Sequence, residues 1–134
     1  MPSRCVLDAC ALVALFKNES GAETVSATLA EALSAGYLLP ICAVNWCEVV
    51  YSAARVLGRA PREVVGALTE LPLEFVDVNQ KVAIKAAAVK AEYALGLGDS
   101  FAAALALELG LPLMTCDPDF DALEAHGLEL ARFA

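Results

Sequence analysis

The amino-acid sequence predicts an α/β domain with a central, mostly parallel β-sheet. Short apolar segments rich in Leu, Val and Ile alternate with longer segments of helical character, and this alternation is the pattern of βαβ units. The length of 134 residues suits one domain, and no linker, repeat or low-complexity segment divides the chain. We therefore expect a single domain over residues 1–134.

The two kinds of segment can be placed along the chain. The predicted strands are residues 4–7, 38–41, 74–78, 112–115 and 128–131. The predicted helices are residues 9–16, 21–35, 43–57, 62–71, 80–95, 100–109 and 119–125.

Residue types at the helix ends support these boundaries. The second helix is expected to begin with a capping box, in which Ser20 is the N-cap and Glu23 stands three residues later. Pro61 suits the first turn of the fourth helix, and Asn79 suits the N-cap of the fifth. Two glycines follow predicted helices and suit their C-terminal caps, Gly58 and Gly110.

The composition is unusually apolar for a small domain. Hydrophobic residues make up 59% of the chain and the mean hydropathy is +0.61, so we expect another subunit or a partner to cover some of the surface. The uninterrupted apolar runs are far shorter than the roughly 20 residues that a bilayer core requires. Asp8 also interrupts the apolar stretch near the N-terminus, which argues against a signal peptide. We expect a cytoplasmic protein without a membrane span.

The five cysteines, at positions 5, 10, 42, 47 and 116, form no C-x-x-C pair, and the chain has a single histidine, His126. We expect buried, reduced thiols rather than a zinc site. One histidine near the C-terminus is also a poor basis for a catalytic triad. Gly96 and Gly98 lack the rest of a phosphate-binding glycine loop.

Three aspartates are expected at one edge of the sheet. Asp8 directly follows the first predicted strand, and Asp117 comes two residues after the fourth. Asp99 opens the helix that leads into that fourth strand. The carboxyl ends of parallel strands share one edge, where ligands bind in open α/β sheets. Each aspartate also stands where a helix N-cap is expected, and capping alone explains any one of them; capping and metal binding are compatible.

Glu48 lies inside a predicted helix, and its position there has two interpretations. Together with Asn45, Ser52 and Arg55 it forms a narrow polar stripe on an otherwise apolar helix. This stripe is either a solvated face or the wall of a cleft above the sheet edge, with Glu48 directed at the aspartates. In the second case, several carboxylates would converge and raise one another's pKa values unless a cation is bound. Mg²⁺ and Mn²⁺ take such oxygen ligands, and a bound ion activates water for attack on a phosphate.

Four segments carry a family resemblance. VLDACAL (6–12) resembles the first motif of PIN domains, a strand that ends in an aspartate. NWCEV (45–49) resembles the second, LGLGDSFA (95–102) the third, and LPLMTCDPDF (111–120) the fourth. The order and spacing of the four match over essentially the whole chain. The likeness is strongest to the short PIN toxins, called VapC, of VapBC toxin–antitoxin pairs.

This resemblance implies a Rossmann-like, three-layer α/β/α sandwich. It also implies an endoribonuclease that cleaves RNA with Mg²⁺ or Mn²⁺, a homodimer, and inhibition by a cognate antitoxin. It assigns catalysis to Asp8, Glu48, Asp99 and Asp117. Among these, Asp8, Asp99 and Asp117 would bind the metal, while Thr115 and Asp119 would be accessory residues.

The chain departs from the family pattern at two positions. Cys10 stands where many members have a serine or threonine hydroxyl, which puts full activity in question. Ser100 follows Asp99 where some relatives have a basic residue. The fold could therefore serve a catalytically weak or inactive protein-interaction module instead. A phosphoacceptor receiver domain is a further alternative, but it would require two adjacent acids after the first strand and a late lysine, and neither is present.

The net charge of −8 is unfavourable for RNA binding. Two basic groups are candidates for phosphate contacts, although both also suit an ordinary solvated surface. The candidates for RNA contact are Arg55, Arg59 and Arg62, and a second group is Lys81, Lys85 and Lys90. With so little attraction, RNA shape rather than charge is expected to govern target choice.

Overall fold

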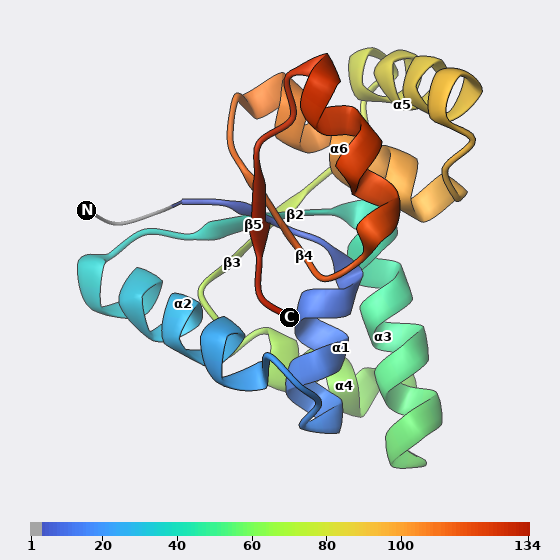
Figure 1. Cartoon of the computed structure of the whole chain (residues 1–134). Coiled ribbons are helices and arrows are strands. Elements are labelled where there is room, and N and C mark those ends of the chain that lie inside the picture. Colours follow the sequence, from blue (N-terminus) through green and yellow to red (C-terminus); the bar gives the residue numbers. More distant parts are fainter. Residues whose placement is uncertain (1–3) are drawn as a thin grey trace.

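Strands and helices alternate along residues 4–134, the part of the chain that the computed structural model describes (Figure 1). Residues 1–3 of the expected domain lie outside this part. The elements are β1 (Val6–Leu7), α1 (Ala9–Lys17), α2 (Ala22–Ala35), β2 (Leu39–Cys42), α3 (Ala43–Leu57), α4 (Pro61–Leu68), β3 (Leu73–Val76), α5 (Gln80–Tyr93), α6 (Leu97–Leu109), β4 (Leu113–Thr115), the 3₁₀ segment η1 (Pro118–His126) and β5 (Leu130–Arg132). Each predicted element is found near its expected position, and the α/β class is confirmed.

All strand pairings in the described residues are parallel, as predicted. β4 lies between β1 and β5, and β2 pairs with β3. The carboxyl ends of β1 and β4 therefore lie at the same edge, because Leu7 is opposite Met114 in the register. This shared edge places the residues that follow these two strands next to each other.

Helices cover both sides of the strands and make the three layers that were expected. In Figure 1, α1–α4 lie below the strands, whereas α5, α6 and η1 lie above them. Neighbouring strand residues divide between two cores, since side chains alternate between the faces of a sheet. Leu7 and Met114 pack in the core with α1–α4, and Val6 and Leu113 pack in the core with α5, α6 and η1.

Most of the predicted caps are present. The Asn79 side chain accepts a hydrogen bond from the Val82 N–H at 2.9 Å, and Pro61 begins α4. Gly58 and Gly110 have left-handed backbone conformations at the ends of α3 and α6. These ends are therefore fixed by local chemistry, as the sequence indicated.

The capping box predicted at Ser20 is wrong. The N-cap of α2 is Gly21, which has a φ of 89° and gives no side-chain cap. A Cβ at Gly21 would lie 2.5 Å from a Phe133 ring carbon, so the close approach of the C-terminal segment requires glycine here. Tertiary packing thus sets this boundary and overrides the local capping signal.

Two further expectations concern the burial of the cysteines and the presence of membrane spans. All five cysteines are free, as expected, but only Cys5 and Cys42 are buried, whereas Cys10 and Cys116 are partly buried and Cys47 is exposed. Within residues 4–134, no helix combines the length and the apolar character needed to cross a bilayer.

Candidate active site

The candidate site lies at the carboxyl edge of the sheet, where the predicted acids meet. Asp8 follows β1, Asp117 follows β4, and Asp99 lies in the first turn of α6. Carboxylate oxygens of Asp99, Asp117 and Asp119 all lie within 4.8 Å of one another. Asp8 and Glu48 are close enough to this group to perturb Asp99 electrostatically. Residues from four distant stretches of the chain therefore share one site.

Asp8 is the buried acid of the site. Its side chain is 3% exposed and accepts hydrogen bonds from the Ala9 N–H at 2.8 Å, the Thr115 hydroxyl at 2.9 Å and the Cys10 thiol at 3.2 Å. Burial raises the pKa of Asp8, and the nearby Asp117 adds to the rise, while these three hydrogen bonds oppose it. The contact with Ala9 makes Asp8 the N-cap of α1 as well.

Thr115 connects two acids of the site. Its hydroxyl donates to Asp8 and accepts from the Asp117 backbone N–H at 3.0 Å. One Asp117 oxygen in turn accepts from the Asp119 N–H at 2.9 Å, which caps η1. The capping role predicted for Asp8 and Asp117 is therefore confirmed. Asp117 retains a second oxygen for another partner.

Asp99 is not the N-cap that the sequence suggested. The helix α6 begins at Leu97 with Gly96 as its N-cap, so Asp99 lies inside the first turn. Burial raises the pKa of Asp99 to about 7, with further contributions from Asp8 and Asp117 and smaller ones from Glu48 and Asp119. The carboxyl group of Asp99 is thus poised to bind a proton near neutral pH unless a cation takes its place.

Glu48 extends from α3 toward the first turn of α6. Its carboxylate lies against Gly98, and Asn45 donates a hydrogen bond to it at 2.9 Å. Burial raises the pKa of Glu48, Asp8 adds to the rise, and the hydrogen bond from Asn45 lowers it. The polar stripe on α3 therefore begins in the site, whereas Arg55 further along it is exposed to solvent.

Within the described structure, the basic residues expected to contact RNA make no contact with the carboxylates of the candidate site. Arg55, Arg59 and Arg62 are exposed near the junction of α3 and α4, and Arg59 pairs with Glu63 at 3.2 Å. The lysines of α5 are engaged in other contacts. Lys81 and Lys85 both pair with Glu108, and Lys90 donates to the Leu95 carbonyl.

Three residues near the site received no role from the sequence. Asn45 and Gly98 contact Glu48, and Arg132 donates to the Asp117 carbonyl at 3.2 Å and pairs with Asp121. The sequence contains no signal for Arg132, because the strand predicted at residues 128–131 ended before it. The observed register of β5 places Arg132 opposite Thr115. Asn45 lies in the predicted polar stripe and in the NWCEV motif, and Gly98 lies in the LGLGDSFA motif, but no pattern indicated their contact, since it joins two helices.

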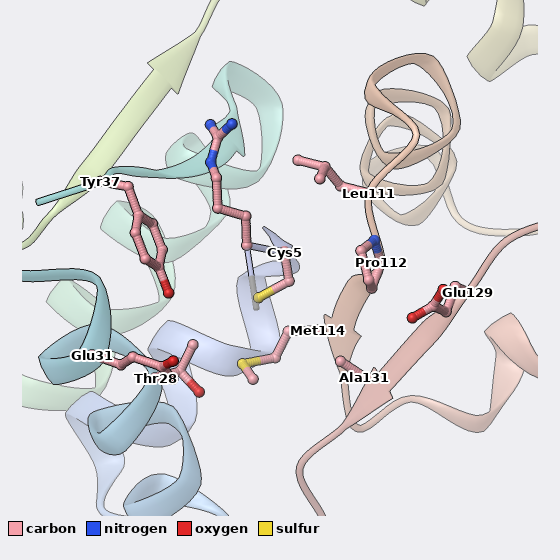
Figure 2. A pocket seen from close by; sticks show the side chains of 10 residues that line it. Cys5, Thr28, Glu31, Tyr37, Leu111, Pro112, Met114, Glu129 and Ala131 are labelled. Carbon is pink, nitrogen blue, oxygen red and sulfur yellow. The ribbon is translucent and has the colours of Figure 1, made fainter. Parts of the chain in front are cut away.

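The molecule also has a pocket of about 650 Å³ at the opposite edge of the sheet. Figure 2 shows Cys5 and Met114 on its inner wall, with Tyr37 and Glu129 on either side. Cys5 and Glu129 precede β1 and β5, so this pocket lies at the amino ends of the strands. None of the candidate site residues lines it.

The carboxylates suit a divalent metal ion. Hard cations such as Mg²⁺ and Mn²⁺ bind carboxylate oxygens, and Asp99, Asp117 and Asp119 each offer one in a single group. Asp8 contributes its charge from the buried side, where both of its oxygens already accept hydrogen bonds. Burial raises the pKa of Asp99 most, and the uncompensated negative charge of the neighbouring acids adds to the rise.

Comparison with solved structures gives the same architecture. A toxin–antitoxin complex from Klebsiella pneumoniae contains a chain that is 25% identical, with a TM-score of 0.66 over 87% of this chain and 89% of that one. VapBC2 from Rickettsia felis, bound to a DNA fragment from its promoter, gives 17% identity and a TM-score of 0.74, over 96% and 98% of the two chains. DNA-bound VapBC from Salmonella typhimurium gives 20% identity and a TM-score of 0.70, over 98% of this chain and 99% of that one.

The sequence itself also matches a family. No curated protein matches it significantly. The family model described as PIN domain, however, matches residues 5–125, a range that contains Asp8, Glu48, Asp99 and Asp117 and nearly every element of the fold. The chain therefore belongs to the PIN domain family.

Proposed function

We propose that this chain is a divalent-metal-dependent endoribonuclease that hydrolyses RNA phosphodiester bonds and acts as the toxin of a toxin–antitoxin pair. The observation that carries the proposal is the approach of Asp99, Asp117 and Asp119 to within 4.8 Å at the carboxyl edge of the sheet. Acids this close repel one another, and a divalent cation offsets that repulsion.

The metal would be held by the aspartates of this edge. Asp99, Asp117 and Asp119 offer the nearest set of oxygens, and Asp8 supplies charge beneath them. Mg²⁺ and Mn²⁺ match these ligands better than softer metals do. When bound, such an ion activates a water molecule and stabilises negative charge on the phosphate under attack.

The protein's own part is to keep the acids in place. Thr115 joins Asp8 to the backbone of Asp117 through two hydrogen bonds, so the two carboxylates cannot separate freely. The N–H groups of Ala9 and Asp119 fix the rotation of the same two side chains. Such preorganisation is what hydrolysis of a phosphodiester demands from a protein scaffold.

The toxin assignment rests on the similar structures, which are toxin–antitoxin and VapBC complexes. A cognate antitoxin and a second copy of this chain are the partners we propose. Apolar side chains on the surface of α3 support such partners, because Tyr51 is 64% exposed and Val56 is 51% exposed. With a net charge of −8, the protein would select RNA by shape at a narrow site.

A second candidate function is a PIN-fold interaction module with little or no catalysis. The observation that favours it is Cys10, whose thiol contacts Asp8 at 3.2 Å where many family members carry a hydroxyl. A thiol is a weaker hydrogen-bond donor than a hydroxyl, so the orientation of Asp8 would be less firmly held.

Cleavage of RNA separates these functions. The purified protein is incubated with a panel of structured RNAs, with Mn²⁺ or with excess chelator, alongside Asp99→Asn and the matched charge control Glu129→Gln at the opposite edge of the sheet. We expect Mn²⁺-dependent cleavage by the wild-type protein and the control only. Intact RNA in every sample would favour the interaction module, and cleavage by Asp99→Asn in chelator would reveal a contaminating nuclease.

A further inference from the structure

Glu48 makes an unusually close contact with the backbone of α6. A Cβ built on Gly98 would lie 2.5 Å from both Glu48 carboxylate oxygens, closer than any real Cβ contact. Gly98 is not among the glycines with positive φ, so its backbone conformation would accept alanine. Glycine at position 98 therefore leaves room for Glu48 in its present position, and a larger residue would push the flexible glutamate side chain away.

Asn45 holds the same two groups together. It lies one turn before Glu48 on α3 and is 0% exposed. Its Nδ2 donates to Glu48 Oε1 and to the Gly98 carbonyl, each at 2.9 Å. Both partners are acceptors, so only the amino end of the amide can face them. One buried amide thus bridges a carboxylate of α3 and the backbone of α6.

The carbonyl oxygen of the Asn45 amide, Oδ1, is buried and makes no hydrogen bond within the described part of the chain. A buried carbonyl without a donor is unfavourable, and an apolar side chain of similar size would avoid it. Stability of the fold alone therefore does not explain asparagine at position 45, whereas the two bonds from Nδ2 do.

The position of this bridge relates it to the candidate site. Gly98 immediately precedes Asp99 in the first turn of α6, so the contacts of Asn45 and Gly98 fix Glu48 beside Asp99. Without them, a half-buried glutamate repelled by Asp8 and Asp99 would turn toward solvent. Its flexible side chain has several rotatable bonds that favour this release.

We propose that Asn45 and Gly98 are positioning residues that hold Glu48 at the acidic site and thereby strengthen binding of a divalent cation there. The proposal rests on the proposed function for the identity of the ligand. It assigns no contact with substrate to either residue. Partners that orient metal-binding groups in other proteins affect metal affinity by about 10-fold or more, and we expect an effect of that size here.

The test combines Mn²⁺ titration calorimetry with thermal melting in chelator, on the full chain and without RNA. Asn45→Leu removes both bonds but keeps the side-chain volume, and Gly98→Ala inserts a methyl group against Glu48. Each change is expected to weaken Mn²⁺ binding about 10-fold. Neither change should lower the melting temperature in chelator appreciably, because the displaced Glu48 side chain is flexible and free to turn toward solvent, away from the neighbouring acids. Gly66→Ala, at a helical glycine with open space around it, is the matched control and should change neither quantity for the worse.

A Glu48→Ala background supplies the decisive comparison. With the carboxylate gone, Asn45→Leu and Gly98→Ala should each change Mn²⁺ affinity by less than about 2-fold. Effects that are as large in this background as in the wild-type protein would overturn the positioning role. Failure of the wild-type protein to bind Mn²⁺ would contradict the proposed function as well, while retained binding with unchanged affinity in both single variants would overturn this inference alone.

Discussion

The raised pKa of Asp99 predicts how stability depends on pH in the absence of metal. In the unfolded chain this carboxyl group has its ordinary pKa of 3.8, and in the folded protein the pKa is about 7. Between these two values the folded state binds a proton that the unfolded state has already released. Folding stability contributed by Asp99 is therefore fully present below about pH 4 and is lost as the pH rises to about 7.

The magnitude follows from the same two values. A rise from 3.8 to about 7 corresponds to at most about 4 kcal/mol of unfolding free energy. Asp99 is only half-buried, so solvent screens the charges around it and about 2 kcal/mol is the realistic loss. Mn²⁺ should restore this stability at neutral pH, because it binds the ionised form and not the unfolded chain.

Urea denaturation over a series of pH values in chelator measures this effect. The wild-type unfolding free energy should fall by about 2 kcal/mol more than that of Asp99→Asn between about pH 4 and pH 7, because the amide does not titrate. Glu129→Gln, which removes an acid at the other sheet edge, should retain the wild-type slope. Equal slopes for the wild-type protein and Asp99→Asn would refute the reasoning that burial and the neighbouring acids raise the pKa of Asp99.

Three other changes have defined outcomes. Mn²⁺ or Mg²⁺ should raise the wild-type melting temperature, and Asp8→Asn or Asp99→Asn should abolish both this rise and RNA cleavage; a rise that persists in both variants would place the ion elsewhere. Thr115→Val removes the donor to Asp8 and the acceptor for the Asp117 N–H, which should cost about 2–4 kcal/mol by denaturant titration and abolish cleavage; a wild-type midpoint would contradict this. Cys10→Ser should give Asp8 a stronger donor and increase single-turnover cleavage severalfold, and a decrease would show that the thiol itself is needed.

The sequence predicted those features of the fold and site that depend on local pattern. Periodicity located the strands and helices, and the rule that parallel strands share a carboxyl edge predicted that Asp8 and Asp117 lie close together. Asn79 and Gly58 cap their helices because a side-chain acceptor and a left-handed backbone are local properties.

The sequence did not predict features that depend on contacts between distant segments of the chain. Gly21 rather than Ser20 begins α2 because Phe133, more than a hundred residues later, packs against it. Asp99 was expected to cap α6, because aspartate is a favoured N-cap residue. The helix begins earlier, at Leu97, so Asp99 lies in its first turn. The bridge from Asn45 to Gly98 joins two helices, and no spacing within either helix indicates it.

The central claim is that carboxylates from separate elements of the fold hold one divalent cation. Anomalous diffraction from crystals soaked in Mn²⁺ tests it most directly, because the signal locates the metal without reference to activity. We expect a manganese peak in contact with Asp99 and Asp117, which is absent from crystals of Asp99→Asn. A peak at another surface, or none at saturating Mn²⁺, would contradict the claim.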